Sequence, residues 1–194
     1  KDYFMFFAYI FAGVLVFWLI AKHMNKQRNH EKAVEKVSAR LKKICGKPGE
    51  VLKNVTLNLP EGKMTFDAVL MDKRGVYLVR TYGWGIKIYG TPDGAMWRRE
   101  DAKRKEEFEN PLLELKKGAE EIAKVMEENG VQNLKVMPMV VFADNFQTPE
   151  LYLGYGSFST TYQELKNWYK KQSGVKEVQY DYDKVSSIIK ELTK

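Results

Sequence analysis

The sequence predicts an α/β fold in which an N-terminal transmembrane helix precedes a mixed β-sheet flanked by helices. Three observations carry this prediction: an uncharged apolar run over 3–21, a strand–turn–strand pattern over 64–82, and a helix followed by a buried strand over 110–143. An antiparallel hairpin joined to a β-α-β crossover gives a mixed sheet with helices on its faces. The expected units are a transmembrane anchor at 1–21, a basic juxtamembrane helix at 22–45 and an α/β domain at 46–194.

The composition fits one domain with an appendage. The chain has 194 residues, of which 44% are hydrophobic, enough to build one core of ordinary size. Cys45 is the single cysteine of the chain, so an intramolecular disulfide framework is excluded. A lone thiol is more typical of a reducing compartment such as the cytosol.

The appendage is the run at 3–21, which contains no charged residue. A helix of this length rises about 28 Å, close to the thickness of a bilayer's hydrocarbon core. The chain starts with Lys1 and Asp2 and continues with bulky aromatic residues, whereas a signal peptide has a basic start and a shorter apolar core. We therefore expect an uncleaved membrane anchor.

The positive charge of the chain is concentrated directly after this run. Residues 22–43 contain eight Lys or Arg and two Glu, while residues 44–194 carry 23 basic and 22 acidic side chains. The positive-inside rule predicts a single-pass protein of the inner membrane, with the N-terminus outside and the C-terminal domain in the cytoplasm. The basic residues expected at anionic lipid headgroups are Lys22, Lys26, Arg28 and Lys32. Val34, Val37 and Leu41 have helical spacing, so this segment is expected to continue the anchor helix.

The remaining elements follow from periodicity and turn signals. Strands are expected at 50–59, 64–71 and 76–82, with a hairpin turn at 72–75 and a continuation of the same sheet at 85–90. Asn110-Pro111 is typical of a helix start, and Asn129-Gly130 of a helix end. A buried strand at 134–143 and two further helices, the first capped by Thr161, complete the chain.

One spacing pattern resembles a known family. Asp67 opens a strand, Gly75 follows eight residues later, and Arg80-Thr81-Tyr82 begins thirteen residues after the aspartate. With Ile88-Tyr89-Gly90 and Asn110-Pro111-Leu112, this pattern over about 31–145 is similar to the nuclease-related domain (NERD) family. That resemblance implies a restriction-endonuclease-like fold.

The same resemblance implies a metal site, from which this sequence departs. In such nucleases an aspartate and a glutamate hold a divalent cation, and a nearby lysine supports the nucleophile. Here Asp67 is kept, Arg80 replaces the glutamate and Tyr82 replaces the lysine, while Glu114 stands where the family has glutamine. Because a guanidinium cannot ligate a cation, we expect a degenerate site with no catalytic residue, no metal and no cofactor.

Other candidate motifs favour structural interpretations. His23 and His30 are the only histidines and are expected to be solvated surface residues far from the cleft. The glycine-rich segment at 83–90 lacks the lysine and hydroxyl residue of a phosphate-binding loop. Residues 97–109 alternate acids and bases, which favours a solvated, salt-bridged segment. A nucleic-acid groove is the alternative, and it would use Trp97, Arg98, Arg99, Lys103, Arg104 and Lys105.

Two functions are compatible with these features. The first is a catalytically inactive nuclease-like domain, not an enzyme, that acts as an interaction or accessory module at the cytoplasmic membrane face beside a membrane-protein partner. The second is a membrane-tethered protein that binds or processes nucleic acid. The nearly neutral charge of 44–194 favours the first, because binding to a phosphate backbone needs several basic contacts.

Overall fold

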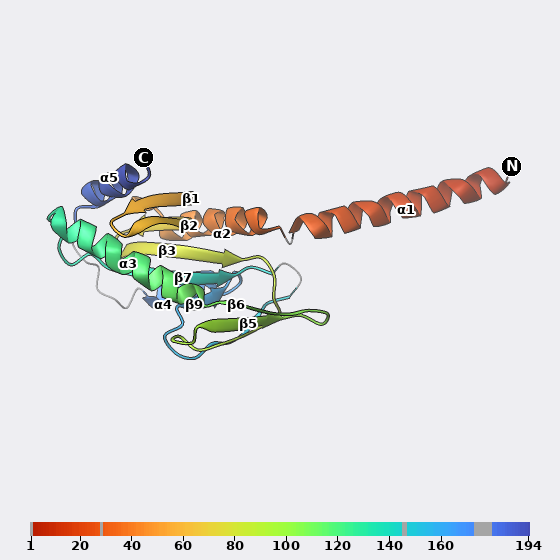
Figure 1. The fold of residues 1–194 in the computed structure, drawn as a ribbon. Helices are drawn as coiled ribbons and strands as arrows, with labels where there is room; N and C mark the ends of the chain where they lie inside the picture. Colours follow the sequence, from red (N-terminus) through yellow and green to blue (C-terminus); the bar gives the residue numbers. More distant parts are fainter. Residues whose placement is uncertain (1, 28, 145–146, 173–179) are drawn as a thin grey trace.

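The computed structural model describes residues 2–27, 29–144, 147–172 and 180–194, and of residues 2–4, 6, 23–27 and 172 it describes the backbone alone. The described helices are α1 (Asp2–Gln27), α2 (His30–Cys45), α3 (Pro111–Glu128), α4 (Leu165–Gln172) and α5 (Tyr182–Leu192). The described strands are β1 (Glu50–Leu59), β2 (Gly62–Asp72), β3 (Gly75–Tyr82), β4 (Lys87–Tyr89), β5 (Met96–Glu100), β6 (Lys105–Glu109), β7 (Val136–Phe142), β8 (Glu150–Tyr152) and β9 (Ser159–Thr161). Figure 1 shows a domain of packed helices and sheets from which α1 extends away.

The larger sheet has the strand order β1-β2-β3-β7-β9. β1, β2 and β3 are antiparallel neighbours, and β7 joins β3 in parallel after the crossover through α3. The short strand β9 extends the parallel part on the far side of β7. The predicted mixed α/β architecture is therefore confirmed.

Helices cover both faces of this sheet (Figure 1). One face packs against the apolar sides of α3 and α5, where Leu115, Ile122 and Ile189 are buried. The other face packs against α2 and α4, where Val37 and Leu41 are buried. Since α2 supplies part of this second core, the segment predicted as a juxtamembrane helix is an integral layer of the domain.

The turn between β2 and β3 forms as predicted and requires glycine at its end. Asp72 pairs with Gly75 across the two-residue loop, and Gly75 has φ of 140°. A Cβ atom at position 75 would overlap the carbonyl oxygen of Lys135, which also accepts a hydrogen bond from the Val76 amide at 2.8 Å. Glycine is needed here both for the backbone conformation and for this close approach.

The expected continuation of the same sheet at 85–90 is wrong. β4 belongs to a second sheet of order β6-β5-β4-β8, which starts after the Gly83-Trp84-Gly85 segment. Trp97 of β5 is buried, while the charged residues Arg99 and Glu106 pair across β5 and β6. Residues 97–109, predicted to be a solvated, salt-bridged segment, thus form ion pairs across two paired strands, while Trp97 is buried.

The expected single helix across the α1–α2 boundary is also wrong. α1 ends at Gln27 and α2 begins at His30. Asn29 has an extended backbone, and its side-chain oxygen accepts a hydrogen bond from the Glu31 amide at 2.9 Å. This N-cap satisfies a backbone donor that has no partner within the helix, so a new helix starts here.

The prediction of a transmembrane helix is wrong as well. Within the described part of the chain, no helix combines the length and the apolar character that a membrane crossing requires. The predicted single-pass topology at the inner membrane depended on that helix and is wrong with it.

Candidate functional site

The candidate site lies where the pairing of β2 and β3 ends. Ala68 and Val79 are the last paired residues, and Asp67 and Arg80 stand next in the same register. Asp67 turns its carboxylate back onto β3, where Oδ2 accepts a hydrogen bond from the Thr81 amide at 2.6 Å. Its side chain is only 7% exposed. The carboxylate therefore supplies an acceptor to an amide of β3 at the point where β2 and β3 separate.

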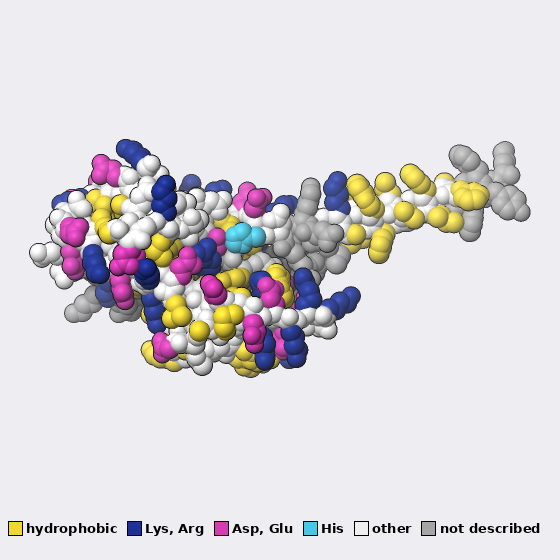
Figure 2. All heavy atoms as spheres, viewed as in Figure 1, with side chains coloured by type: hydrophobic (Ala, Val, Ile, Leu, Met, Phe, Trp, Pro, Cys, Tyr) yellow, Lys and Arg dark blue, Asp and Glu magenta, His cyan; other side chains and the backbone are white. Residues whose placement is uncertain are grey.

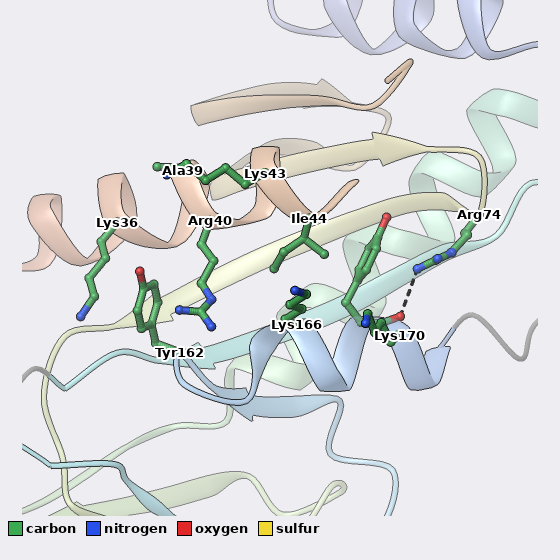
Figure 3. Close-up of a pocket in the computed structure, with 10 residues that line it drawn as sticks. Lys36, Ala39, Arg40, Lys43, Ile44, Arg74, Tyr162, Lys166 and Lys170 are labelled. Atoms are coloured by element: carbon green, nitrogen blue, oxygen red, sulfur yellow. Dashed lines mark hydrogen bonds between the residues drawn. The ribbon is translucent and has the colours of Figure 1, made fainter. Parts of the chain in front are cut away.

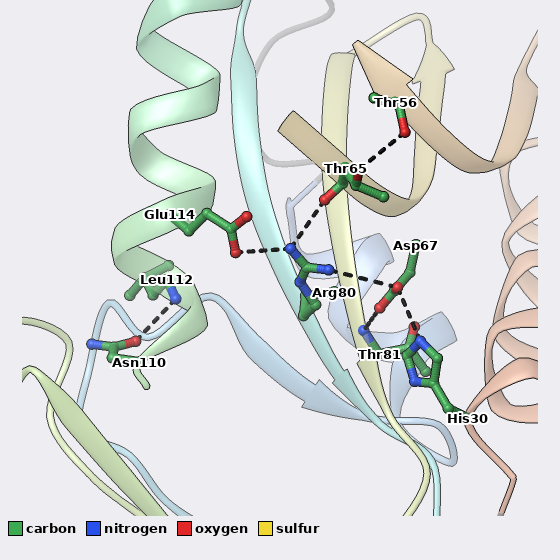
Figure 4. Close-up of polar contacts among 9 residues, drawn as sticks. All are labelled: His30, Thr56, Thr65, Asp67, Arg80, Thr81, Asn110, Leu112 and Glu114. Carbon is green, nitrogen blue, oxygen red and sulfur yellow. Dashed lines mark hydrogen bonds and ion pairs between the residues drawn. The ribbon is translucent and has the colours of Figure 1, made fainter. Parts of the chain in front are cut away.

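Arg80 lies between two carboxylates. Its Nη1 is 3.7 Å from Asp67 Oδ1, and its Nη2 donates to Glu114 Oε2 at 2.8 Å and to the Thr65 carbonyl at 3.0 Å (Figure 4). The family spacing predicts that Asp67, Arg80 and Glu114 belong to one site, and the structure places them together. The contact of Arg80 with Asp67 is an ion pair, while the shorter hydrogen bonds of the guanidinium go to α3 and to the β2 backbone.

His30 completes the site and was missed by the sequence analysis. It is the first residue of α2, and its Nε2 lies 3.2 Å from Asp67 Oδ1. Its side chain is 58% exposed, so it is a surface residue, but the expectation that it lies far from the cleft is wrong. His30 and Asp67 are 37 positions apart in the sequence, and the packing of α2 on the sheet brings them together. No local sequence pattern reveals this contact. The side chain of His23 lies outside the described residues.

Tyr82 stands at the position where the family resemblance implies lysine. Its ring packs against Phe108 and Phe142, with centroid separations of 4.9 and 5.4 Å. Burial raises the pKa of Tyr82 to about 12, and the positive charges of Arg80 and Arg99 offset part of that shift. The side chain is therefore neutral near pH 7 and anchored in the core, so it cannot supply a cationic amine.

The donor set does not fit a divalent cation. Mg²⁺ and Ca²⁺ require oxygen ligands, and a guanidinium offers only N–H donors. Arg80 stands between Asp67 and Glu114, so its fixed positive charge would repel a cation bound by these two carboxylates. Over the described ranges, no three His, Cys, Asp or Glu side chains are grouped so that they could hold a metal ion.

The residues of the alternative nucleic-acid groove lie in the β5–β6 hairpin. Trp97 is 1% exposed and its Nε1 donates to the Thr91 carbonyl, so its ring has no open face for a base. Arg99 contacts Glu106 and covers the ring of Trp84. Arg98 and Lys105 form ion pairs with Glu100, and Arg104 forms one with Asp101. Lys103 is exposed in the turn between the strands.

Of the four residues expected at a membrane surface, the structure describes the side chains of two, Lys22 and Lys32. The Lys22 ammonium lies 4.6 Å from the centroid of the Trp18 ring on α1, and Lys32 is exposed on α2. The side chain of Lys26 and all of Arg28 lie outside the described residues.

Comparisons with known proteins identify the family of this chain. An uncharacterized protein of Bacillus anthracis is 33% identical over 96 residues, which cover 48% of this chain and 44% of that protein. The chain thus spans less than half the length of this curated relative. No solved structure matches significantly. The pattern that defines the nuclease-related domain matches residues 26–143, a stretch that contains His30, Asp67, Arg80 and Glu114. Because this match covers more than half of the sequence, the chain belongs to the nuclease-related domain (NERD) family.

Proposed function

We propose that this nuclease-related domain is a non-catalytic interaction or accessory module in which Arg80 takes the place of a catalytic cation. The observation that carries the proposal is the position of the Arg80 guanidinium, 3.7 Å from Asp67 Oδ1 and 2.8 Å from Glu114 Oε2. A divalent cation in a nuclease neutralises carboxylates of this kind and activates water. Arg80 supplies the neutralising charge and cannot supply a metal-bound water.

The burial of the site supports this substitution. Asp67 is almost fully buried, and a carboxylate left in such a place without a positive neighbour bears a large desolvation cost. Arg80 is itself only 20% exposed, so solvent screens the pair weakly. The guanidinium therefore acts as a fixed structural counterion that stabilises the end of the β2–β3 hairpin.

The alternative function, nucleic-acid binding through the β5–β6 hairpin, receives less support. Backbone binding gains affinity from several Lys or Arg side chains that release counterions. In this hairpin Trp97 is buried and the arginines are engaged with carboxylates. Figure 2 shows basic and acidic side chains interleaved over the visible face of the domain, without a continuous basic stripe.

A nuclease assay on the full chain tests the proposal. With Mg²⁺ or Mn²⁺ present, the unmodified chain should leave single-stranded and double-stranded DNA and RNA intact. The double variant Arg80→Glu/Tyr82→Lys returns the Glu-x-Lys pattern next to Asp67 and should gain metal binding. Cleavage by the unmodified chain that requires the metal and disappears in Asp67→Ala would refute the proposal.

A further inference from the structure

A second site lies on the face of the larger sheet that α2 and α4 cover, in a groove between these two helices. The groove encloses a cavity of about 580 Å³. Figure 3 shows Arg40 and Ile44 of α2 facing Lys166 of α4 across this space, with Tyr162 at one end and Arg74 at the other. None of its lining residues belongs to the site around Asp67, so the groove is independent of the proposed function.

The lining of the groove is strongly basic. Of the ten described residues that line it, six are basic and none is acidic: Lys36, Arg40, Lys43, Arg74, Lys166 and Lys170. The basic side chains that α2, α4 and Arg74 bring together therefore produce a local positive potential in the groove.

Helical spacing arranges these charges in two rows. Lys36, Arg40 and Lys43 occupy one side of α2, and Lys166 and Lys170 occupy one side of α4. Seven helical residues rise about 10 Å, so the longer row matches a short chain of phosphate groups. Arg74, from the turn between β2 and β3, closes the end of the groove (Figure 3).

The two arginines are held in place by neutral groups. The Arg40 guanidinium lies 4.5 Å from the centroid of the Tyr162 ring, and its Nη2 donates to the Gln163 carbonyl at 3.3 Å. The Arg74 guanidinium lies 4.3 Å from the centroid of the Tyr169 ring and donates to the Tyr169 carbonyl at 3.1 Å. Ring stacking and carbonyl acceptors orient a guanidinium without occupying it with a carboxylate.

Tyr169 is fixed in turn by the hairpin. Its hydroxyl donates to Asp72 Oδ2, and Asp72 Oδ1 accepts from the Arg74 amide at 2.9 Å. Burial raises the pKa of the Asp72 carboxyl, while its hydrogen bond with the Arg74 backbone and the Arg74 charge act in the opposite direction. Asp72 lies beneath the groove and does not line it. The floor of the groove is therefore pre-organised before a ligand arrives.

We propose that this groove binds a small molecule that carries two or more phosphate groups. Its volume lies within the range of small-molecule sites, about 300–1,000 Å³. Fixed arginines provide forked donors for phosphate oxygens, and the lysines provide adjustable point charges. An anion with several charges can contact several of these basic side chains at once, which gives the site its preference for multiply charged anions.

The test is a titration of the full chain with inorganic tripolyphosphate, orthophosphate, ATP and AMP, followed by calorimetry and thermal unfolding. Tripolyphosphate should bind at least tenfold more tightly than orthophosphate and raise the melting temperature. Tighter binding of ATP than of tripolyphosphate would show that the nucleoside also contacts the groove, while equal binding would show that the phosphates alone are recognised. Both results support the site.

A matched pair of variants identifies the groove. Lys43→Gln/Lys166→Gln removes two charges from the lining and should weaken tripolyphosphate binding at least tenfold while leaving the melting temperature of the unliganded chain equal or higher. Lys32→Gln/Lys42→Gln removes the same charge from α2 outside the lining and should leave binding unchanged. Equal binding by both variants, or no binding of tripolyphosphate to the unmodified chain, would overturn the proposal. Tighter binding of duplex DNA at equal phosphate concentration would also overturn it.

Discussion

Arg80 and Asp67 face each other at the end of the β2–β3 ladder, with Arg80 Nη1 3.7 Å from Asp67 Oδ1. The same aspartate accepts a hydrogen bond from the Thr81 amide and lies within hydrogen-bond distance of His30 Nε2. It therefore connects β2, β3 and α2. Arg80 extends this network to Glu114 of α3. A single buried carboxylate and one guanidinium thus join elements from both faces of the larger sheet.

A double-mutant cycle measures how strongly this pair contributes to stability. Asp67→Asn keeps an oxygen acceptor for the Thr81 amide and removes the charge, and Arg80→Met removes the guanidinium. Each change should lower the free energy of unfolding by about 2 kcal/mol, because Asp67→Asn removes one of the two carboxylates at Arg80, and Arg80→Met leaves the buried Asp67 with only the Thr81 amide and His30. The double variant should lose at least about 1 kcal/mol less than the sum. Chemical denaturation provides all four values.

Lys117→Gln is the control for this cycle. Lys117 pairs with Glu61 at 3.0 Å, but both side chains are more than half exposed, so its loss should not be measurable. Additive effects of Asp67→Asn and Arg80→Met would show that the two charges do not interact energetically.

The turn at Gly75 gives a second prediction. Gly75→Ala should lower the free energy of unfolding by about 3 kcal/mol, because the added Cβ is both strained at positive φ and in conflict with the Lys135 carbonyl. Gly62→Ala should cost only about 1 kcal/mol, because Gly62 also has positive φ but an added Cβ meets no atom within 4 Å. Equal losses in the two variants would show that the Lys135 carbonyl does not constrain position 75.

The raised pKa of Tyr82 predicts that the free energy of unfolding falls at alkaline pH. Its folded-state pKa of about 12 lies above its ordinary value of 10.0, so the folded state retains the phenolic proton longer than the unfolded state. This contribution to stability is complete below pH 10 and declines as the pH rises toward 12. Tyr82→Phe should therefore flatten the decline of the unfolding free energy over this interval. Tyr155→Phe, at a fully exposed side chain, is the control, and an equally flattened curve there would refute the assignment.

Local signals were sufficient to predict the elements that have strong periodicity or distinctive caps. The hairpin through Asp72 and Gly75 and the helix that starts after Asn110 both occur as predicted. Asn110 accepts a hydrogen bond from the Leu112 amide at 2.9 Å, as its position before a proline indicates. The family spacing assigned Asp67 and Arg80 to one site, and the structure places Arg80 Nη1 3.7 Å from Asp67 Oδ1.

The second sheet and the role of His30 could not be predicted from the sequence. β4 and β8 have three residues each, too few for an alternating pattern, and they pair over more than sixty positions, as Lys87 does with Glu150. His30 reaches Asp67 only because α2 packs on the sheet. The basic groove likewise forms only because α2 and α4 pack side by side. In the sequence, their basic residues belong to two separate segments with no visible relation.

The central claim, that Arg80 replaces the catalytic cation, is tested most directly by calorimetric titration of the full chain with MnCl₂. We expect no saturable binding at millimolar metal in the unmodified chain, and one binding event in Arg80→Glu/Tyr82→Lys. Saturable binding of one Mn²⁺ to the unmodified chain that disappears in Asp67→Ala would contradict the claim.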